Sequence, residues 1–279
     1  MPLLAIPFPA VDPVIFSVGP FSVRWYALAY IAGLVGGWLY ARRLIGSPGL
    51  WGPVRAPTRT DLDDMLVYVA LGVVLGGRLG YVLFYNLQEY LADPLSVFAV
   101  WRGGMSFHGG FAGALAGMWL LARRRGLAPL SLFDLAGAVA PIGLFLGRIA
   151  NFINGELWGR PAPDLPWAVT FPHAAPVPRH PSQLYEALAE GVLLFIAVSI
   201  AVRVAGFRRP GAVSGVFAMG YAVARIGCEF FREPDPQLGF LAGGLTMGML
   251  LSIPLFVAGA ALLWLALSGR SLPQGEKTA

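Results

Sequence analysis

Long apolar runs separated by short polar stretches are the dominant pattern along the chain. Each run holds about 20 residues, which is the length a helix needs to cross the hydrocarbon core of a bilayer. The runs cover residues 21–41, 64–84, 105–122, 133–153, 184–204, 213–231 and 246–267. The pattern therefore predicts an all-α integral membrane protein in which residues 1–279 form one domain with seven transmembrane helices.

The composition agrees with a membrane protein. Hydrophobic residues make up 57% of the chain and charged residues 13%. No internal repeat is evident, which disfavours a transporter built from two similar halves. Residues 1–12 contain no lysine or arginine, so they do not resemble a cleavable signal peptide. The polar residues 268–279 are expected to form a flexible tail.

The basic residues predict the orientation in the membrane. By the positive-inside rule, the side richer in lysine and arginine is cytoplasmic. The N-terminus is then outside, the C-terminus is cytoplasmic, and residues 154–181 form an outer loop. On the cytoplasmic side the connections hold Arg42, Arg43, Arg55, Arg59, Arg123, Arg124, Arg125, Arg203, Arg208, Arg209, Arg270 and Lys277, and on the outer side they hold Arg102, Arg160, Arg179 and Arg232.

The same distribution disfavours nucleic-acid binding, because the basic residues flank the apolar runs instead of lining one groove. The single cysteine, Cys228, lies within an apolar run and has no partner for a disulfide in the chain. We interpret it as a small apolar packing residue.

The most unusual polar segment is 147–160, at the end of the fourth apolar run. It places arginines, asparagines and a glutamate at the edge of the predicted hydrocarbon core. Charges at that depth are costly and usually mark a substrate path, an ion path or a catalytic site. The alternative is a set of interface anchors at a helix-ending turn.

Other polar residues fall at the same predicted depth. They come from six apolar runs or their outer ends, so the sequence predicts one shared polar cavity that opens toward the outer leaflet. The set contains Arg24, Tyr26, Arg78, His108, Arg148, Asn151, Asn154, Glu156, Arg160, His180, Tyr185, Glu229 and Arg232.

The sixth run carries polar residues at helical spacing. Tyr221, Arg225 and Glu229 are four residues apart and therefore share one helix face, with Arg232 three residues further on. A self-neutralising Arg225–Glu229 pair is one interpretation. The other is phosphate binding by Arg225, because a guanidinium stays charged when buried and matches phosphate geometry.

His108 is a candidate for proton transfer. Gly109 and Gly110 follow it and leave space beside the imidazole, whose unperturbed pKa lies near neutrality. A lone histidine is more often structural. Metal binding is disfavoured, because His108, His173 and His180 lack the spacing of metal ligands.

Several longer motifs occur in order along nearly the whole chain. They are DPVIFS at 12–17, GGRLGYVLFYN at 76–86, GGMSFHGG at 103–110, GRIANFINGELWGR at 147–160, HPSQLYE at 180–186 and RIGCEFFREPD at 225–235. With these motifs the chain resembles bacterial prolipoprotein diacylglyceryl transferases.

The resemblance implies a multi-pass protein of the bacterial inner membrane whose active site faces the outer leaflet. Its partners would be phosphatidylglycerol, a preprolipoprotein signal peptide with a lipobox cysteine, and membrane lipids. The reaction would attach the diacylglyceryl group to that cysteine as a thioether and release glycerol 1-phosphate. It requires no metal and no organic cofactor.

The resemblance also implies roles for individual residues. His108 would act as the base, while Arg148 and Arg225 would bind the phosphate and stabilise the leaving group. Glu229 would orient an arginine. The lipid-binding or framework set would comprise Arg148, Asn151, Glu156, Gly159, Tyr26, Tyr221, Glu229 and Arg232. Two other classes stay open, namely a phospholipid transporter or scramblase and a scaffold protein that has lost catalysis.

Overall fold

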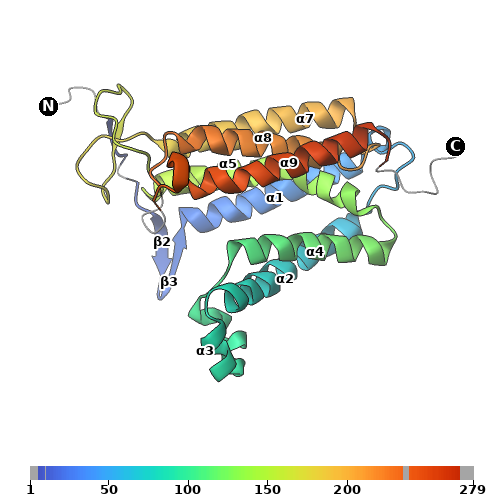
Figure 1. Cartoon of the computed structure of the whole chain (residues 1–279), viewed down its shortest axis with the longest axis horizontal. Coiled ribbons are helices and arrows are strands. Elements are labelled where there is room, and N and C mark those ends of the chain that lie inside the picture. The colour runs from blue at the N-terminus through green and yellow to red at the C-terminus, as the bar shows by residue number, and fades with distance from the viewer. Residues whose placement is uncertain (1–5, 10, 235–238, 271–279) are drawn as a thin grey trace.

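The protein is an elongated bundle of helices in the computed structural model, which describes residues 6–9, 11–234 and 239–270 (Figure 1). The long helices are α1 (Trp25–Ile45), α2 (Arg59–Phe84), α4 (Phe107–Arg125), α5 (Pro129–Ile153), α7 (Leu194–Val204), α8 (Ala212–Glu229) and α9 (Met247–Leu267). The short helix α6 (Ser182–Glu186) and the π-helical segment η4 (Ala187–Leu193) run directly into α7. Shorter elements are α3 (Leu87–Ala92) and the 3-10 turns η1 (Pro48–Leu50), η2 (Pro94–Phe98), η3 (Val100–Arg102) and η5 (Ala242–Gly244).

The helices fall on the predicted apolar runs. Among the described residues, four helical stretches are suited by length and composition to cross a membrane, namely Arg59–Phe84, Pro129–Ile153, Ser182–Val204 and Met247–Leu267. The chain is therefore mostly helical and suited to a membrane. The seven spans and the orientation of the termini stay predictions.

The described residues also form two small sheets, which the sequence analysis did not predict. Strand β2 (Val14–Val18) pairs antiparallel with β3 (Phe21–Arg24), and β1 (Ile6–Pro7) pairs parallel with β4 (Val169–Thr170). The hairpin of β2 and β3 turns at Gly19, whose φ of 60° suits glycine. The prediction that the first helix begins at residue 21 is wrong, because the chain completes this hairpin before α1 begins at Trp25.

Helices α2 and α4 pack through their backbones. Gly72, Gly76 and Gly80 on α2 face Gly109 and Gly113 on α4, at the four-residue spacing of close helix pairs in membranes. A Cβ atom on Gly113 would overlap the Gly72 carbonyl, and one on Gly76 would overlap the Gly109 carbonyl. Only glycine at these positions permits the observed approach.

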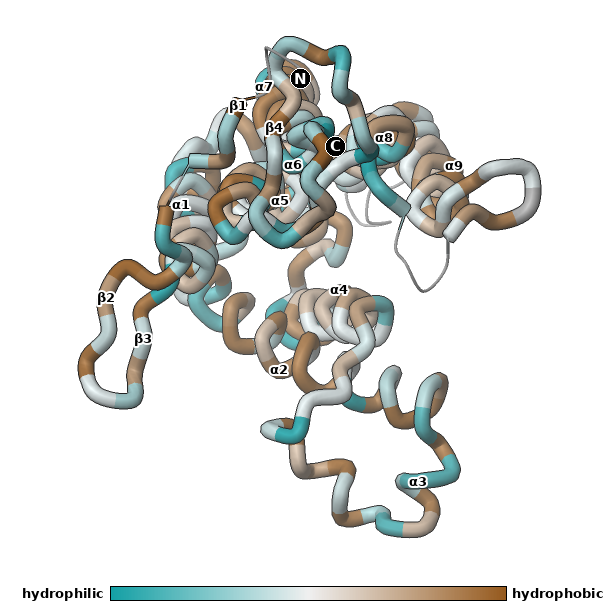
Figure 2. The backbone as a smooth tube through the Cα atoms, turned by 90° about the vertical axis from the view of Figure 1, so that its left-hand side faces the viewer, coloured by the Kyte–Doolittle hydropathy of each residue, from teal (hydrophilic) through white to brown (hydrophobic). Residues whose placement is uncertain are grey.

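A neighbouring face of α2 is apolar and exposed. Leu71, Leu75, Leu79 and Leu83 repeat every four residues, and each is at least 53% exposed. Figure 2 shows hydrophobic residues recurring along the helices. Such a stripe is unfavourable in water and suits contact with lipid chains.

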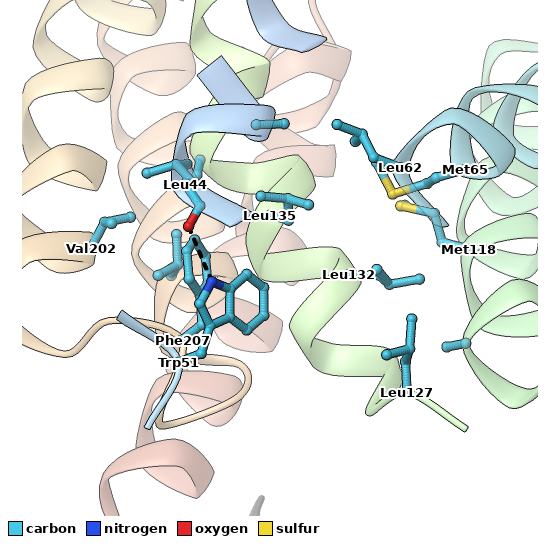
Figure 3. Close-up of a cluster of buried hydrophobic side chains, with 14 of the residues drawn as sticks. Leu44, Trp51, Leu62, Met65, Met118, Leu127, Leu132, Leu135, Val202 and Phe207 are labelled. Carbon is cyan, nitrogen blue, oxygen red and sulfur yellow. Dashed lines mark hydrogen bonds between the residues drawn. The ribbon is translucent and has the colours of Figure 1, made fainter. Parts of the chain in front are cut away.

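A hydrophobic core lies near the end of the bundle that holds residue 270 (Figure 3). Trp51 and Phe207 stack there with ring centroids 4.4 Å apart, and the Trp51 indole donates to the Leu44 carbonyl over 3.1 Å. This core joins the connections 46–58 and 205–211 to helix α5. It holds one end of the bundle together.

The two ends of the bundle differ in charge. Arginines occupy the last turns of α1, α4 and α7, where they meet the negative ends of the helix dipoles. Arg42 and Arg123 also lie over Trp38 and Trp119, with the guanidinium carbon 4.4 and 5.3 Å from the ring centroids. The predicted outer loop 154–181 lies at the opposite end, beside β1 (Figure 1). Of the predicted flexible tail 268–279, residues 271–279 lie outside the described part of the chain.

Candidate functional site

A fully buried carboxylate on α6 joins arginines from different helices. Glu186 Oε2 lies 3.2 Å from Nη1 of Arg148 on α5. Its Oε1 lies 2.5 Å from Nη1 of Arg225 on α8, and 3.3 Å from Nη1 of Arg232. Arg148 and Arg225, which the sequence predicts to act together, thus meet on opposite oxygens of one side chain.

A second buried carboxylate, Glu190, also holds Arg148. The Nε and Nη2 atoms of Arg148 donate to Glu190 Oε2 over 3.2 and 3.0 Å. The other oxygen, Oε1, has no hydrogen-bond partner among the described residues, and it lies 3.9 Å from Nη1 of Arg225. Glu190 therefore depends mainly on one arginine, whereas Glu186 contacts three.

Glu229 completes the set. It pairs with Arg225 on the preceding turn of α8, and its Oε1 lies 3.9 Å from Arg232 Nε. The expected role of Glu229 in orienting an arginine stays a prediction. Three arginines are thus balanced by three glutamates in an ion-pair cluster consisting of Arg148, Glu186, Glu190, Arg225, Glu229 and Arg232.

The cluster is open on its cationic side. The side chains of Arg148 and Arg225 are 16% and 14% exposed, whereas those of Glu186 and Glu190 are 0% exposed. A ligand approaching the cluster would therefore meet guanidinium groups first. That arrangement is suited to an anion.

Local backbone geometry brings Glu190 to Arg148. Glu190 lies inside the π-helical segment η4, a rare wide turn that occurs often at functional sites. The next residue, Gly191, packs on Phe145 of α5, where an added Cβ would lie 2.7 Å from the Phe145 Cβ. The absence of a side chain at Gly191 allows η4 and α5 to approach closely.

The segment 147–160 folds back on itself. The Asn151 amide donates to Glu156 Oε1 over 2.7 Å, and the Gln183 amide donates to the Glu156 carbonyl over 2.5 Å. A Cβ on Gly159 would lie 2.5 Å from the Phe231 carbonyl oxygen and 2.7 Å from the His180 Cβ. Gly159 therefore serves as a framework residue, and lipid binding by Asn151 and Glu156 stays a prediction.

The outer loop is tied to the end of α8. Arg160 donates to the backbone carbonyls of Arg232 and Glu229, both over 3.0 Å. His180 Nδ1 lies 3.2 Å from the Tyr185 hydroxyl. Burial, together with the charge of Arg160, lowers the pKa of His180 below its usual range. This histidine is therefore neutral near pH 7.

The two tyrosines predicted to hydrogen-bond the lipid headgroup lie on different helices. Tyr221 is on α8, one turn before Arg225, and stacks on Phe217 with ring centroids 6.2 Å apart. Tyr26 is on α1, and its hydroxyl lies 3.3 Å from that of Tyr30. Their contacts with lipid stay predictions.

His108 lies away from these charges. It is exposed in the first turn of α4, where its ring contacts Phe107. Within the described ranges, no hydrogen bond or ion pair joins it to the ion-pair cluster. Its role as the base therefore stays a prediction.

Arg78 corrects the prediction of one shared cavity. It is only 4% exposed and donates to the backbone carbonyls of the segment that leads into α4. The acceptors are the carbonyls of Ser96, Val97, Ala99, Gly103 and Gly104, at 2.6 to 3.4 Å. The turns η2 and η3 direct their carbonyls at the guanidinium, so Arg78 holds this segment instead of facing the cluster.

Sequence reasoning missed Glu186 as a functional residue and did not consider Glu190. The available signal was a pair of carboxylates four residues apart at the start of the fifth apolar run. Cys228 is buried, as expected for a packing residue. Among the described residues, no group of three or more histidine, cysteine, aspartate or glutamate side chains is arranged to hold a metal ion.

Comparison with known proteins gives consistent matches. Residues 13–265 match the family model described as prolipoprotein diacylglyceryl transferase. Proteins named phosphatidylglycerol–prolipoprotein diacylglyceryl transferase are similar over nearly their whole length. The one from Methylocella silvestris is 63% identical over 96% of this chain and 98% of its own. Those from Beijerinckia indica and Nitrobacter hamburgensis are 60% and 58% identical, over 93% and 95% of this chain and 94% and 91% of their own.

Proposed function

Because this chain belongs to the prolipoprotein diacylglyceryl transferase family, we propose that it transfers the sn-1,2-diacylglyceryl group of phosphatidylglycerol to a preprolipoprotein. The acceptor is the thiol of the lipobox cysteine. Its sulfur bonds to the glyceryl carbon as the bond from that carbon to the phosphate oxygen breaks. The products are a thioether and sn-glycerol 1-phosphate, and this is the first step of bacterial lipoprotein maturation.

One observation carries the proposal, namely that Arg148 and Arg225 converge on the same carboxylate with their guanidinium groups partly exposed. A guanidinium has five N–H donors, and the hydrogen bonds of Arg148 to Glu190 use two of them. The donors of Arg148 that make no hydrogen bond among the described residues would bind a lipid phosphate. They would also stabilise the negative charge that develops on the leaving phosphate ester.

The thiol must lose its proton as it attacks. A free cysteine has a pKa near 8.5, so a base increases the fraction of reactive thiolate at neutral pH. His108 is the proposed base. Its exposed imidazole lies in the first turn of α4, and this end of α4 is at the same end of the bundle as the C-terminal ends of α5 and α8 (Figure 1). The thiol proton would pass to this imidazole.

The other predicted residues support lipid binding in this proposal. Tyr26 and Tyr221 bind the headgroup, and Asn151 and Glu156 shape the segment next to Arg148. Glu229 and Arg232 orient Arg225 through their shared contacts. The reaction involves no redox change, and the proposal assigns no step to a metal or an organic cofactor.

The proposal includes a location. All seven long helical stretches cross the inner membrane, with the N-terminus outside and the C-terminus in the cytoplasm. The arginines at the ends of α1, α4 and α7 support this orientation under the positive-inside rule. The ion-pair cluster then lies near the outer leaflet, where a translocated signal peptide presents its cysteine.

The test is incubation of the purified protein with phosphatidylglycerol and a lipobox peptide, followed by mass spectrometry of the peptide. We expect the cysteine to gain the mass of one diacylglyceryl group. A peptide with serine in place of the cysteine is the control. Lipid movement across vesicles without peptide modification would favour a transporter and overturn the proposal.

A further inference from the structure

The charge balance of the ion-pair cluster limits how it can bind an anionic lipid. Three arginines already face three glutamates, so the cluster is close to neutral before any ligand arrives. A phosphate diester adds one negative charge to a site where Glu186 and Glu190 are 0% exposed. An unbalanced buried charge is costly. The phosphate and the carboxylates therefore compete for the same guanidinium donors.

The contacts distinguish the two fully buried carboxylates, Glu186 and Glu190. Glu186 contacts Arg148, Arg225 and Arg232, and Glu229 pairs with Arg225 on its own helix. Glu190 has hydrogen bonds to Arg148 only, through one oxygen. Glu190 Oε1 and Glu186 Oε2 are both buried without a hydrogen-bond partner among the described residues. Releasing Glu190 breaks contacts with fewer arginines than releasing Glu186, and it frees the N–H donors of Arg148 that face Glu190.

We propose that Glu190 is a displaceable counter-ion, which holds Arg148 in the empty site and yields it to the phosphate of the donor lipid. This inference rests on the proposed function, because it specifies how that site takes up its anionic substrate. Glu190 competes with the substrate, so its charge weakens lipid binding. The same competition promotes departure of the anionic glycerol phosphate, since Glu190 regains Arg148 when the product leaves.

The test measures binding of phosphatidylglycerol to the purified protein in detergent micelles. In Glu190→Gln the amide oxygen can still accept from Arg148, but the negative charge is gone. We expect this variant to bind phosphatidylglycerol about tenfold or more tightly than the wild type, a size typical of removing one close charge contact. Binding of uncharged diacylglycerol should not change. Glu190→Met supplies a second neutral variant, for which the same direction is expected.

A matched control neutralises a different buried carboxylate on the same helix as Arg148. Asp134 lies near the other end of α5 and accepts from the backbone amides of Gly211 and Ser214 over 2.8 and 2.7 Å. Asp134→Asn should leave the affinity for phosphatidylglycerol unchanged. A tighter complex in both Asp134→Asn and Glu190→Gln would indicate a general charge effect and overturn the proposal.

Steady-state transfer gives an independent readout. If Glu190 promotes product release, Glu190→Gln should lower KM for phosphatidylglycerol and lower kcat as well. The proposal is overturned if neither neutral variant binds the lipid more tightly than the wild type, or if both fail to fold, since Glu190 would then be a structural counter-ion. Failure of the proposed function has a different signature, in which the wild type binds the lipid but does not modify the peptide.

Discussion

Removal of Arg148 should destabilise the protein chiefly by leaving Glu190 without a cation. In Arg148→Met, Glu186 keeps its contacts with Arg225 and Arg232, at 2.5 and 3.3 Å. Glu190 keeps only Arg225, at 3.9 Å. Removing one partner of a buried ion pair costs about 3–5 kcal/mol of unfolding free energy. We expect a loss of that size for Arg148→Met.

A second substitution tests where this cost arises. The double variant Arg148→Met/Glu190→Gln no longer contains the uncompensated carboxylate. We expect it to regain roughly 2 kcal/mol relative to Arg148→Met, within the coupling energies of contacting residues. By contrast, Arg148→Met/Glu186→Gln should regain less, because Glu186 is still paired in the single variant. The transfer activity of both double variants should stay low, since Arg148 is also proposed to bind the phosphate.

The measurement is equilibrium unfolding of five proteins in detergent micelles under the same conditions, namely the wild type, Arg148→Met, Glu190→Gln and the two double variants. The double-mutant cycle gives the Arg148–Glu190 coupling directly. If Arg148→Met/Glu190→Gln is no more stable than Arg148→Met, the carboxylate is not the source of the loss. The same conclusion follows if the Glu186 and Glu190 changes restore stability equally.

Three further predictions concern the base, the topology and the helix pair. His108→Asn should slow the transfer step by roughly 10²- to 10⁴-fold without weakening phosphatidylglycerol binding. Raising the pH should recover part of the rate in transfer assays, because the acceptor thiol then ionises unaided. In a Cys228→Ala background, single cysteines are introduced by Asp164→Cys or Arg124→Cys. A membrane-impermeant thiol reagent added from outside should label the Asp164→Cys variant but not the Arg124→Cys variant. Gly113→Ala should lower thermal stability, because the methyl group would overlap the α2 backbone.

Each of these predictions has a contrary outcome. Weaker lipid binding and no pH recovery in His108→Asn would make His108 a ligand-positioning residue. Labelling at Arg124 but not at Asp164 from outside would reverse the proposed orientation. Gly147→Ala is the control for the helix pair, because an added Cβ there meets no atom within 4 Å. Equal stability of Gly147→Ala and Gly113→Ala would contradict the close packing of α2 and α4.

Much of the site could be predicted from local sequence. Arg225 and Glu229 are one helical turn apart, so their pairing follows from helix geometry alone. The segment 147–160 stood out because charges are rare beside an apolar run of membrane-spanning length. Family resemblance identified the reaction, since the motifs occur in order along nearly the whole chain.

Other features depended on contacts between residues far apart in the chain. Arg78 looked like a member of the polar site, but five backbone carbonyls of residues 96–104 surround its guanidinium. The importance of Glu186 and Glu190 became clear only when α5, α6 and α8 were packed together. Neither feature follows from the depth of a residue in its own helix.

The sequence by itself determined the helical membrane architecture and the chemical class of the site. The length of an apolar run and the spacing of charged residues along a helix are local properties, so they are the same however the helices pack together. Only the tertiary structure decided which charges neutralise one another. Ion pairing acts over a few ångströms, so whether Arg148 meets Glu190 depends on the glycine-mediated approach of η4 to α5.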